Sequence, residues 1–61
     1  MKVSEVKKLL RKNGCYIVRQ GSRHEIWMSP ATGKKFPVPR HAAQEVAAGT
    51  LSSIQASAGI D

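Results

Sequence analysis

Cys15 is the only cysteine in this chain of 61 residues, so no disulfide can form within it. One cysteine and two histidines, His24 and His41, at scattered spacing match no zinc-site pattern. A domain this small buries only about 60% of the surface that its unfolded chain exposes. The fold must therefore rest on one small hydrophobic core. Any chemistry must take place on an open face or at an interface with a partner, because a deep cavity and a core do not both fit.

The segment VSEVKKLLRKNG (3–14) predicts a helix. Val6, Leu9 and Leu10 follow the i, i+3, i+4 spacing of a helical stripe that faces a core. Ser4 is a suitable N-cap, and the closing Asn-Gly pair is typical of a helix C-terminus. We expect one amphipathic helix here, with its basic residues on the remaining surface.

Three extended segments follow, CYIVRQ (15–20), HEIWMS (24–29) and KKFPVP (34–39), separated by turns at 21–23 and 30–33. The first is rich in β-branched and aromatic residues, which favour strands. In the second, His24 shares one face with Ile26 and Met28, and Glu25 shares the other with Trp27. The prolines of the third remove hydrogen-bond donors, so we expect an edge strand.

After a connection at 40–49, Thr50 is a candidate cap for a second helix at 51–59. The predicted fold is therefore a single α+β domain over residues 1–61, in the order α-β-β-β-α. A three-stranded antiparallel sheet would carry both helices on one face, as in the double-stranded RNA-binding domain. Trp27 could stack an unpaired base, but so small a core favours a buried position for it, as it does for Cys15. The expected core is Val6, Leu9, Leu10, Ile17, Leu51 and Ile54.

The charge balance indicates a polyanionic partner. Ten Lys and Arg stand against four Asp and Glu, which gives a formal net charge of +6. Nucleic acid, an acidic protein or an anionic membrane would fit this charge. A membrane is disfavoured because the chain has no apolar run of about 20 residues. Neither does an apolar segment follow the N-terminal lysine as in a signal peptide, so we expect a cytoplasmic protein.

Six basic residues are candidates for contact with phosphate groups. Four belong to the first helix, mostly away from its apolar stripe; of the other two, one lies just before the turn at 21–23 and one is its last residue. Such residues either bind a nucleic-acid backbone or form a solvated surface, and four of them on one helix favour phosphate contact. The six are Lys7, Lys8, Arg11, Lys12, Arg19 and Arg23.

His24 follows the Gly-Ser-Arg turn at the start of the second strand. An imidazole can take or give a proton near neutral pH, which suits cleavage of RNA by its own 2′-hydroxyl. Taken alone, a histidine beside a turn is more often a surface residue or a polar strand end than a catalytic group. Ser22 could orient His24, donate to a phosphate oxygen or merely form the turn, and His41 could be a second acid or base, a phosphate contact or a loop residue.

Four segments, in this order, resemble the HicA (YcfA-like) toxins of bacterial toxin–antitoxin pairs. They are KVSEVKKLLRKNG (2–14) followed directly by a strand, GSRH (21–24) before an apolar strand, FPVPRH (36–41) and GTLSSIQASAGI (49–60). The resemblance runs almost from end to end, and the order and spacing of the segments make it specific.

The resemblance implies a ribosome-independent endoribonuclease that cleaves mRNA, with a dsRBD-like fold and with no metal or other cofactor. It implies that the catalytic histidine of the family corresponds to His24. It also implies a HicB-type antitoxin that covers the active face, with operator DNA contacted only indirectly through that antitoxin. The residues themselves leave two alternatives open: a non-catalytic dsRBD-like RNA-binding module and a protein-interaction subunit.

Overall fold

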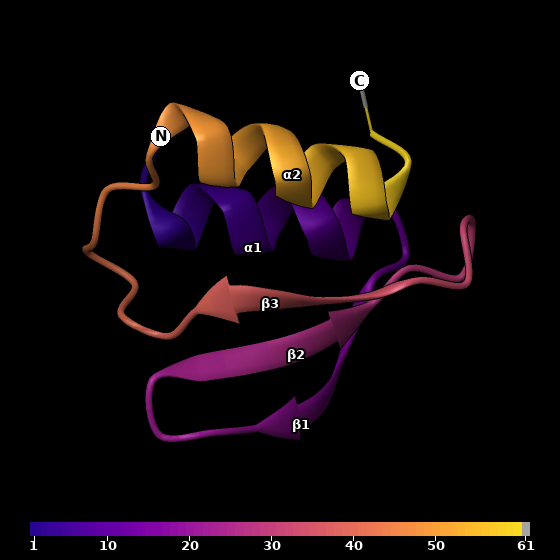
Figure 1. Cartoon of the computed structure of the whole chain (residues 1–61), viewed down its shortest axis with the longest axis horizontal. Coiled ribbons are helices and arrows are strands. Elements are labelled where there is room, and N and C mark those ends of the chain that lie inside the picture. The colour runs from indigo at the N-terminus through magenta and orange to yellow at the C-terminus, as the bar shows by residue number, and fades with distance from the viewer. Residues whose placement is uncertain (61) are drawn as a thin grey trace.

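A computed structural model describes residues 1–60, so Asp61, the last residue of the predicted domain 1–61, lies outside the described residues. The elements are α1 (Val3–Lys12), β1 (Tyr16–Gln20), β2 (His24–Met28), β3 (Lys35–Pro39) and α2 (Ala48–Ala58). Both helices lie on the same side of the sheet and run in the same direction (Figure 1). The predicted α-β-β-β-α order and dsRBD-like arrangement are confirmed.

Helix α1 begins one residue before Ser4, so the prediction of Ser4 as its N-cap is wrong. Lys2 occupies the cap position, and its backbone N–H donates to the Glu5 carboxylate at 2.9 Å. The loop before α2 satisfies the next amides: the N–H of Val3 donates to the carbonyl of Gln44 at 2.9 Å, and that of Ser4 to the carbonyl of Ala42 at 3.0 Å. A side-chain cap is therefore replaced by backbone from a distant segment.

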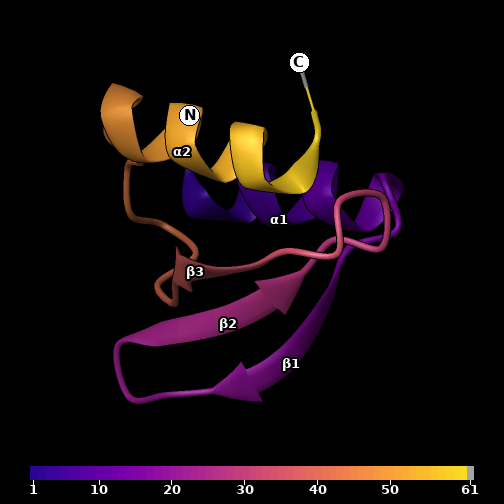
Figure 2. The same ribbon diagram turned by 45° about the vertical axis from the view of Figure 1, so that its right-hand side comes forward.

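The three strands pair antiparallel in the order β1-β2-β3. The pairing places Gln20 opposite Glu25 and His24 opposite Pro39, with a bulge between Ile17 and Arg19. β3 lies at the edge of the sheet, as its prolines predicted. The hairpin between β1 and β2 projects away from α2 (Figure 2).

The core lies between the helices and one face of the sheet. It includes Trp27, which is fully buried, and Cys15, both as predicted. Ile17 and Leu51 are partly buried at its margin. The prediction that Leu9 belongs to the core is wrong, because its side chain is only half-buried and lies outside the core. The buried core residues are Val3, Val6, Leu10, Cys15, Trp27, Phe36, Val38, Val46, Ile54 and Ala58.

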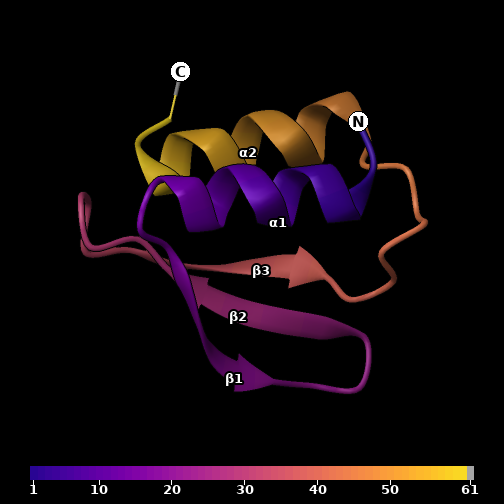
Figure 3. The same ribbon diagram turned by 180° about the vertical axis from the view of Figure 1, so that it is seen from behind.

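Helix α2 begins at Ala48 rather than at residue 51, and its N-cap is Ala47. Thr50 therefore lies inside the first turn and is not the cap, since the backbone N–H of Leu51 already donates to the carbonyl of Ala47 at 2.9 Å. At the other end Gly59 adopts the left-handed conformation with φ of 75°, as is common after a helix. α1 and α2 are seen together from behind in Figure 3.

Candidate active site

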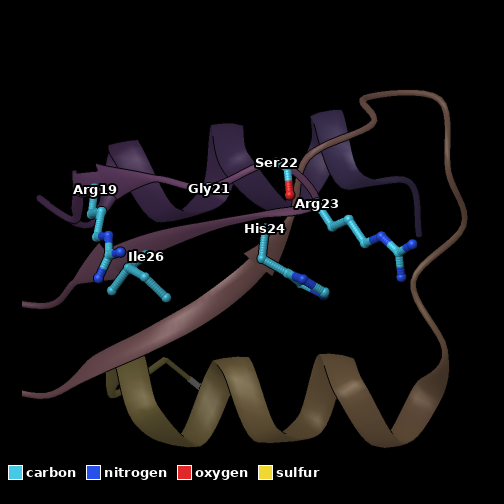
Figure 4. A pocket seen from close by; sticks show the side chains of 6 residues that line it. All are labelled: Arg19, Gly21, Ser22, Arg23, His24 and Ile26. Carbon is cyan, nitrogen blue, oxygen red and sulfur yellow. The ribbon is translucent and has the colours of Figure 1, made fainter.

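His24 is exposed at the first position of β2 and lines an open hollow of about 310 Å³ at the end of the β1–β2 hairpin (Figure 4). Alternation along β2 places its side chain on the face of the sheet away from the helices, opposite to the side chains of Glu25 and Trp27. Four of the residues predicted from the sequence therefore come together here. The hollow is lined by Arg19, Gly21, Ser22, Arg23, His24 and Ile26.

Gly21 allows the chain to turn tightly beside His24. Its backbone N–H donates to the carbonyl of His24 at 2.8 Å. A Cβ atom added at Gly21 would lie 2.9 Å from that carbonyl oxygen, which is closer than such atoms approach without a shift of the backbone. The glycine is therefore required by this close approach, and a larger residue would displace the main chain that carries His24.

Arg40, which the sequence did not single out, holds the same turn from the other side. Its guanidinium Nη1 donates to the carbonyl of Gly21 at 3.0 Å, and its backbone N–H donates to the carbonyl of Arg23 at 3.2 Å. It reaches the turn because it follows Pro39, which pairs with His24. The expected pairing of the second and third strands was the signal that could have identified it.

A buried ion pair lies on the opposite face of β2, directly behind His24. Lys7 Nζ is 2.9 Å from Glu25 Oε1, and the two side chains are 12% and 8% exposed. The indole N–H of Trp27 donates to the same oxygen at 3.2 Å, and Lys7 Nζ donates to the carbonyl of Arg40 at 3.3 Å. α1, β2 and the end of β3 are therefore joined by one polar network.

The network also sets the protonation of Glu25. Burial raises the pKa of this carboxyl, but the hydrogen bonds from Lys7 and Trp27, together with the positive charges of Lys7 and Arg40, outweigh burial and bring the pKa below its ordinary value of 4.5. Lys7, expected among the phosphate-binding residues, is thus engaged in an internal ion pair and does not belong to the exposed basic surface.

The remaining basic residues of α1 lie apart from the hollow. Lys8 and Lys12 line a second hollow with Leu9 on the surface of α1, where the Leu9 side chain is partly open to solvent. The guanidinium of Arg11 lies over the Trp27 ring, 5.3 Å from its centroid. The six predicted basic residues are therefore divided between the hairpin and the helix.

His41 is exposed in the loop that follows β3, where its carbonyl accepts a hydrogen bond from the backbone N–H of Gln44 at 3.1 Å. It does not line the hollow that contains His24. Among residues 1–60, no three His, Cys, Asp or Glu side chains are grouped so that they could hold a metal ion. Within the same residues, neither helix has the length and apolar character needed to cross a bilayer.

Comparison with known proteins identifies the family. A family model described as the HicA toxin of bacterial toxin–antitoxin pairs matches residues 3–60, from the first residue of α1 to Ile60. The matched range contains every residue of the hollow and of the ion-pair network behind it. Searches of curated proteins and of solved structures found no match. The resemblance seen in the sequence is confirmed, and the chain belongs to the HicA toxin family.

Proposed function

We propose that this toxin is an endoribonuclease that cleaves mRNA, with His24 as the general acid or base. The observation that carries the proposal is the exposed imidazole in an open hollow, beside the hydroxyl of Ser22 and the two arginines Arg19 and Arg23. An open hollow at the end of a hairpin can receive a flexible polyanionic strand, which a closed pocket in so small a domain could not.

The arrangement suits cleavage by the RNA's own nucleophile. The 2′-oxygen forms a bond to the adjacent phosphorus as the bond to the 5′-oxygen breaks, which leaves a 2′,3′-cyclic phosphate and a 5′-hydroxyl. His24 would take the proton of the 2′-hydroxyl or give one to the leaving 5′-oxygen. Arg19 and Arg23 would stabilise the negative charge on the phosphoryl oxygens, and Ser22 would donate to one of them or orient the imidazole. This chemistry needs no metal or other cofactor.

Affinity for mRNA would come from the exposed basic residues. Those of the hairpin would contact the phosphates next to the scissile bond, and those of α1 would contact phosphates farther along the strand. The proposed RNA-binding residues are Lys8, Arg11, Lys12, Arg19 and Arg23. Lys7 is left out because its ammonium is paired with Glu25.

A toxin of a toxin–antitoxin pair needs an antitoxin, and we propose a HicB-type protein with an acidic surface that covers the hollow. The chain carries a net charge of +6, and its hairpin exposes two large apolar side chains, Tyr16 (51% exposed) and Val18 (46% exposed). Acidic and apolar groups of a partner would complement this surface. Operator DNA would be contacted only through that partner, and both would act in the cytoplasm.

The test is cleavage of a defined mRNA by the purified protein in EDTA, wild type beside His24→Gln. Glutamine keeps the size and hydrogen bonding of the side chain but cannot transfer a proton near neutral pH, so the rate should fall by about 10²–10⁴-fold. The same substitution at His41, outside the hollow, should have a smaller effect. Circular dichroism checks that both variants fold.

A second substrate tests directly whether the 2′-hydroxyl of the RNA is the nucleophile. A strand with a single 2′-deoxynucleotide at the cleavage position should resist cutting there, and products from the all-RNA strand should end in a cyclic phosphate. Cleavage by His24→Gln at the wild-type rate would refute the role of His24. RNA that is bound but never cut by the wild type would favour the non-catalytic RNA-binding module.

A further inference from the structure

We propose that Arg40 is a positioning residue that fixes the β1–β2 turn and thereby the orientation of His24. The inference rests on the proposed function where it concerns cleavage, but its structural part stands on the contacts of Arg40 alone. Arg40 is placed at the end of β3, and it contacts the turn through both its side chain and its main chain.

Strand pairing holds the two ends of the turn at Gln20 and His24, but the residues between them have few other contacts. Residues 21–24 are all exposed, so burial of apolar surface does not order them. The hydrogen bond from Gly21 to the carbonyl of His24 closes the turn internally but does not attach it to the rest of the domain. The two bonds from Arg40, to the carbonyls of Gly21 and Arg23, make that attachment on either side of Ser22.

Arg40 is itself anchored to the core. Its carbonyl accepts a hydrogen bond from Lys7, whose ammonium is paired with the buried carboxylate of Glu25. Glu25 directly follows His24 in β2, and its carboxylate is also held by the indole of Trp27. The main chain of His24 is therefore fixed on one side through its neighbour and on the other through the turn that Arg40 holds.

The consequence concerns the rate of proton transfer. An acid or base acts efficiently only when its nitrogen lies within hydrogen-bond reach of the reacting oxygen. A misplacement of about 1 Å caused by a change outside the reacting groups can cost on the order of 10²-fold in rate. Loss of the Arg40 side chain should therefore lower the rate of cleavage more than it weakens the binding of RNA.

The experiment compares wild type, Arg40→Met and Lys34→Met. Lys34 lies in the exposed turn before β3, so its substitution controls for the loss of one positive charge. Amide hydrogen exchange of Gly21 and Trp27, measured by NMR, reports the order of the turn and of the core. Single-turnover cleavage of a defined RNA and its dissociation constant separate the rate from the affinity.

In Arg40→Met, exchange of the Gly21 amide should accelerate about fivefold, the fold-change that corresponds to one hydrogen bond of typical net strength, while the Trp27 amide stays protected. The single-turnover rate should fall by about tenfold or more. The dissociation constant should change no more than in Lys34→Met.

Unchanged exchange at Gly21 would overturn the proposal, as would an equal loss of rate in Lys34→Met. Faster exchange of the Gly21 amide in Arg40→Met with an unchanged single-turnover rate of cleavage would overturn the link between the turn and catalysis. If the wild type itself cuts no RNA, the proposed function fails instead, and exchange at Gly21 still decides whether Arg40 holds the turn.

Discussion

Replacing Lys7 with methionine tests what the buried ion pair contributes to this domain. The change keeps the aliphatic stem but removes the ammonium that lies 2.9 Å from Glu25 Oε1, where the carboxylate side chain is only 8% exposed. Removing one member of a buried pair typically costs about 3–5 kcal/mol, because the other charge is left without its partner. Since Trp27 still donates to Glu25 and Arg40 lies nearby, we expect the lower end, about 3 kcal/mol.

That loss is large for so short a chain. Stabilities of roughly 0.05–0.15 kcal/mol per residue place a domain of this length at about 3–9 kcal/mol in total. The midpoint of thermal unfolding should therefore fall by about 12–24 °C, and part of the population should unfold at 37 °C if the wild type lies near the middle of that stability range. Thermal and urea unfolding followed by circular dichroism measure both quantities.

Two further variants make the measurement decisive. Lys8→Met removes the neighbouring exposed lysine of α1 and should change the free energy of unfolding by no more than about 0.5 kcal/mol. The double variant Lys7→Met/Glu25→Gln should recover at least half of the loss, because the amide oxygen still accepts from Trp27 and no buried charge is left alone. Equal losses at Lys7 and Lys8, or a double variant no better than the single one, would refute the reasoning.

The stability of the wild type should fall as the pH drops below 4.5, because Glu25 has a lower pKa in the folded chain and the unfolded chain therefore takes up the proton first. Urea midpoints across this range should depend less on pH in Glu25→Gln. Gly21→Ala should displace the carbonyl of His24 and cost about 1 kcal/mol, with chemical-shift changes confined to the hairpin, since its Cβ would lie 2.9 Å from that oxygen. Ser29→Ala should cost about 1–3 kcal/mol in urea unfolding, because the buried hydroxyl of Ser29 donates to the carbonyl of Ala58 at 2.8 Å. A Ser29→Ala midpoint equal to that of the wild type would show that water or another donor replaces the hydroxyl.

Local pattern was enough to predict the elements and one part of the site. Alternation along 24–29 put Trp27 and His24 on opposite faces, and the small size of the core favoured burial of Trp27. The glycine-containing turn brought Ser22 and Arg23 to the same hollow as His24. These relations depend on residues a few positions apart, where strand and turn geometry are fixed by the chain itself.

Relations between distant segments could not be read in this way. Ser4 is a good cap by residue type, but the backbone of the loop before α2 supplies the partners of the first amides. Lys7 and Lys8 look alike in a basic stretch, and only the position of Glu25 under α1 separates a buried ion pair from an exposed lysine. Arg40 gains its role from the register of β2 and β3, which places the end of one strand beside the turn that begins the other.

The prolines of β3 also determine how the sheet can meet other chains. Because the N–H of Arg40 donates to Arg23 in β2, alternation turns the nitrogens of Pro37 and Pro39 toward the outer edge, where neither has a hydrogen to donate. A strand arriving on that side would find Lys35 as the one outward donor of β3. Edge-to-edge pairing between copies of the protein is thereby disfavoured along β3.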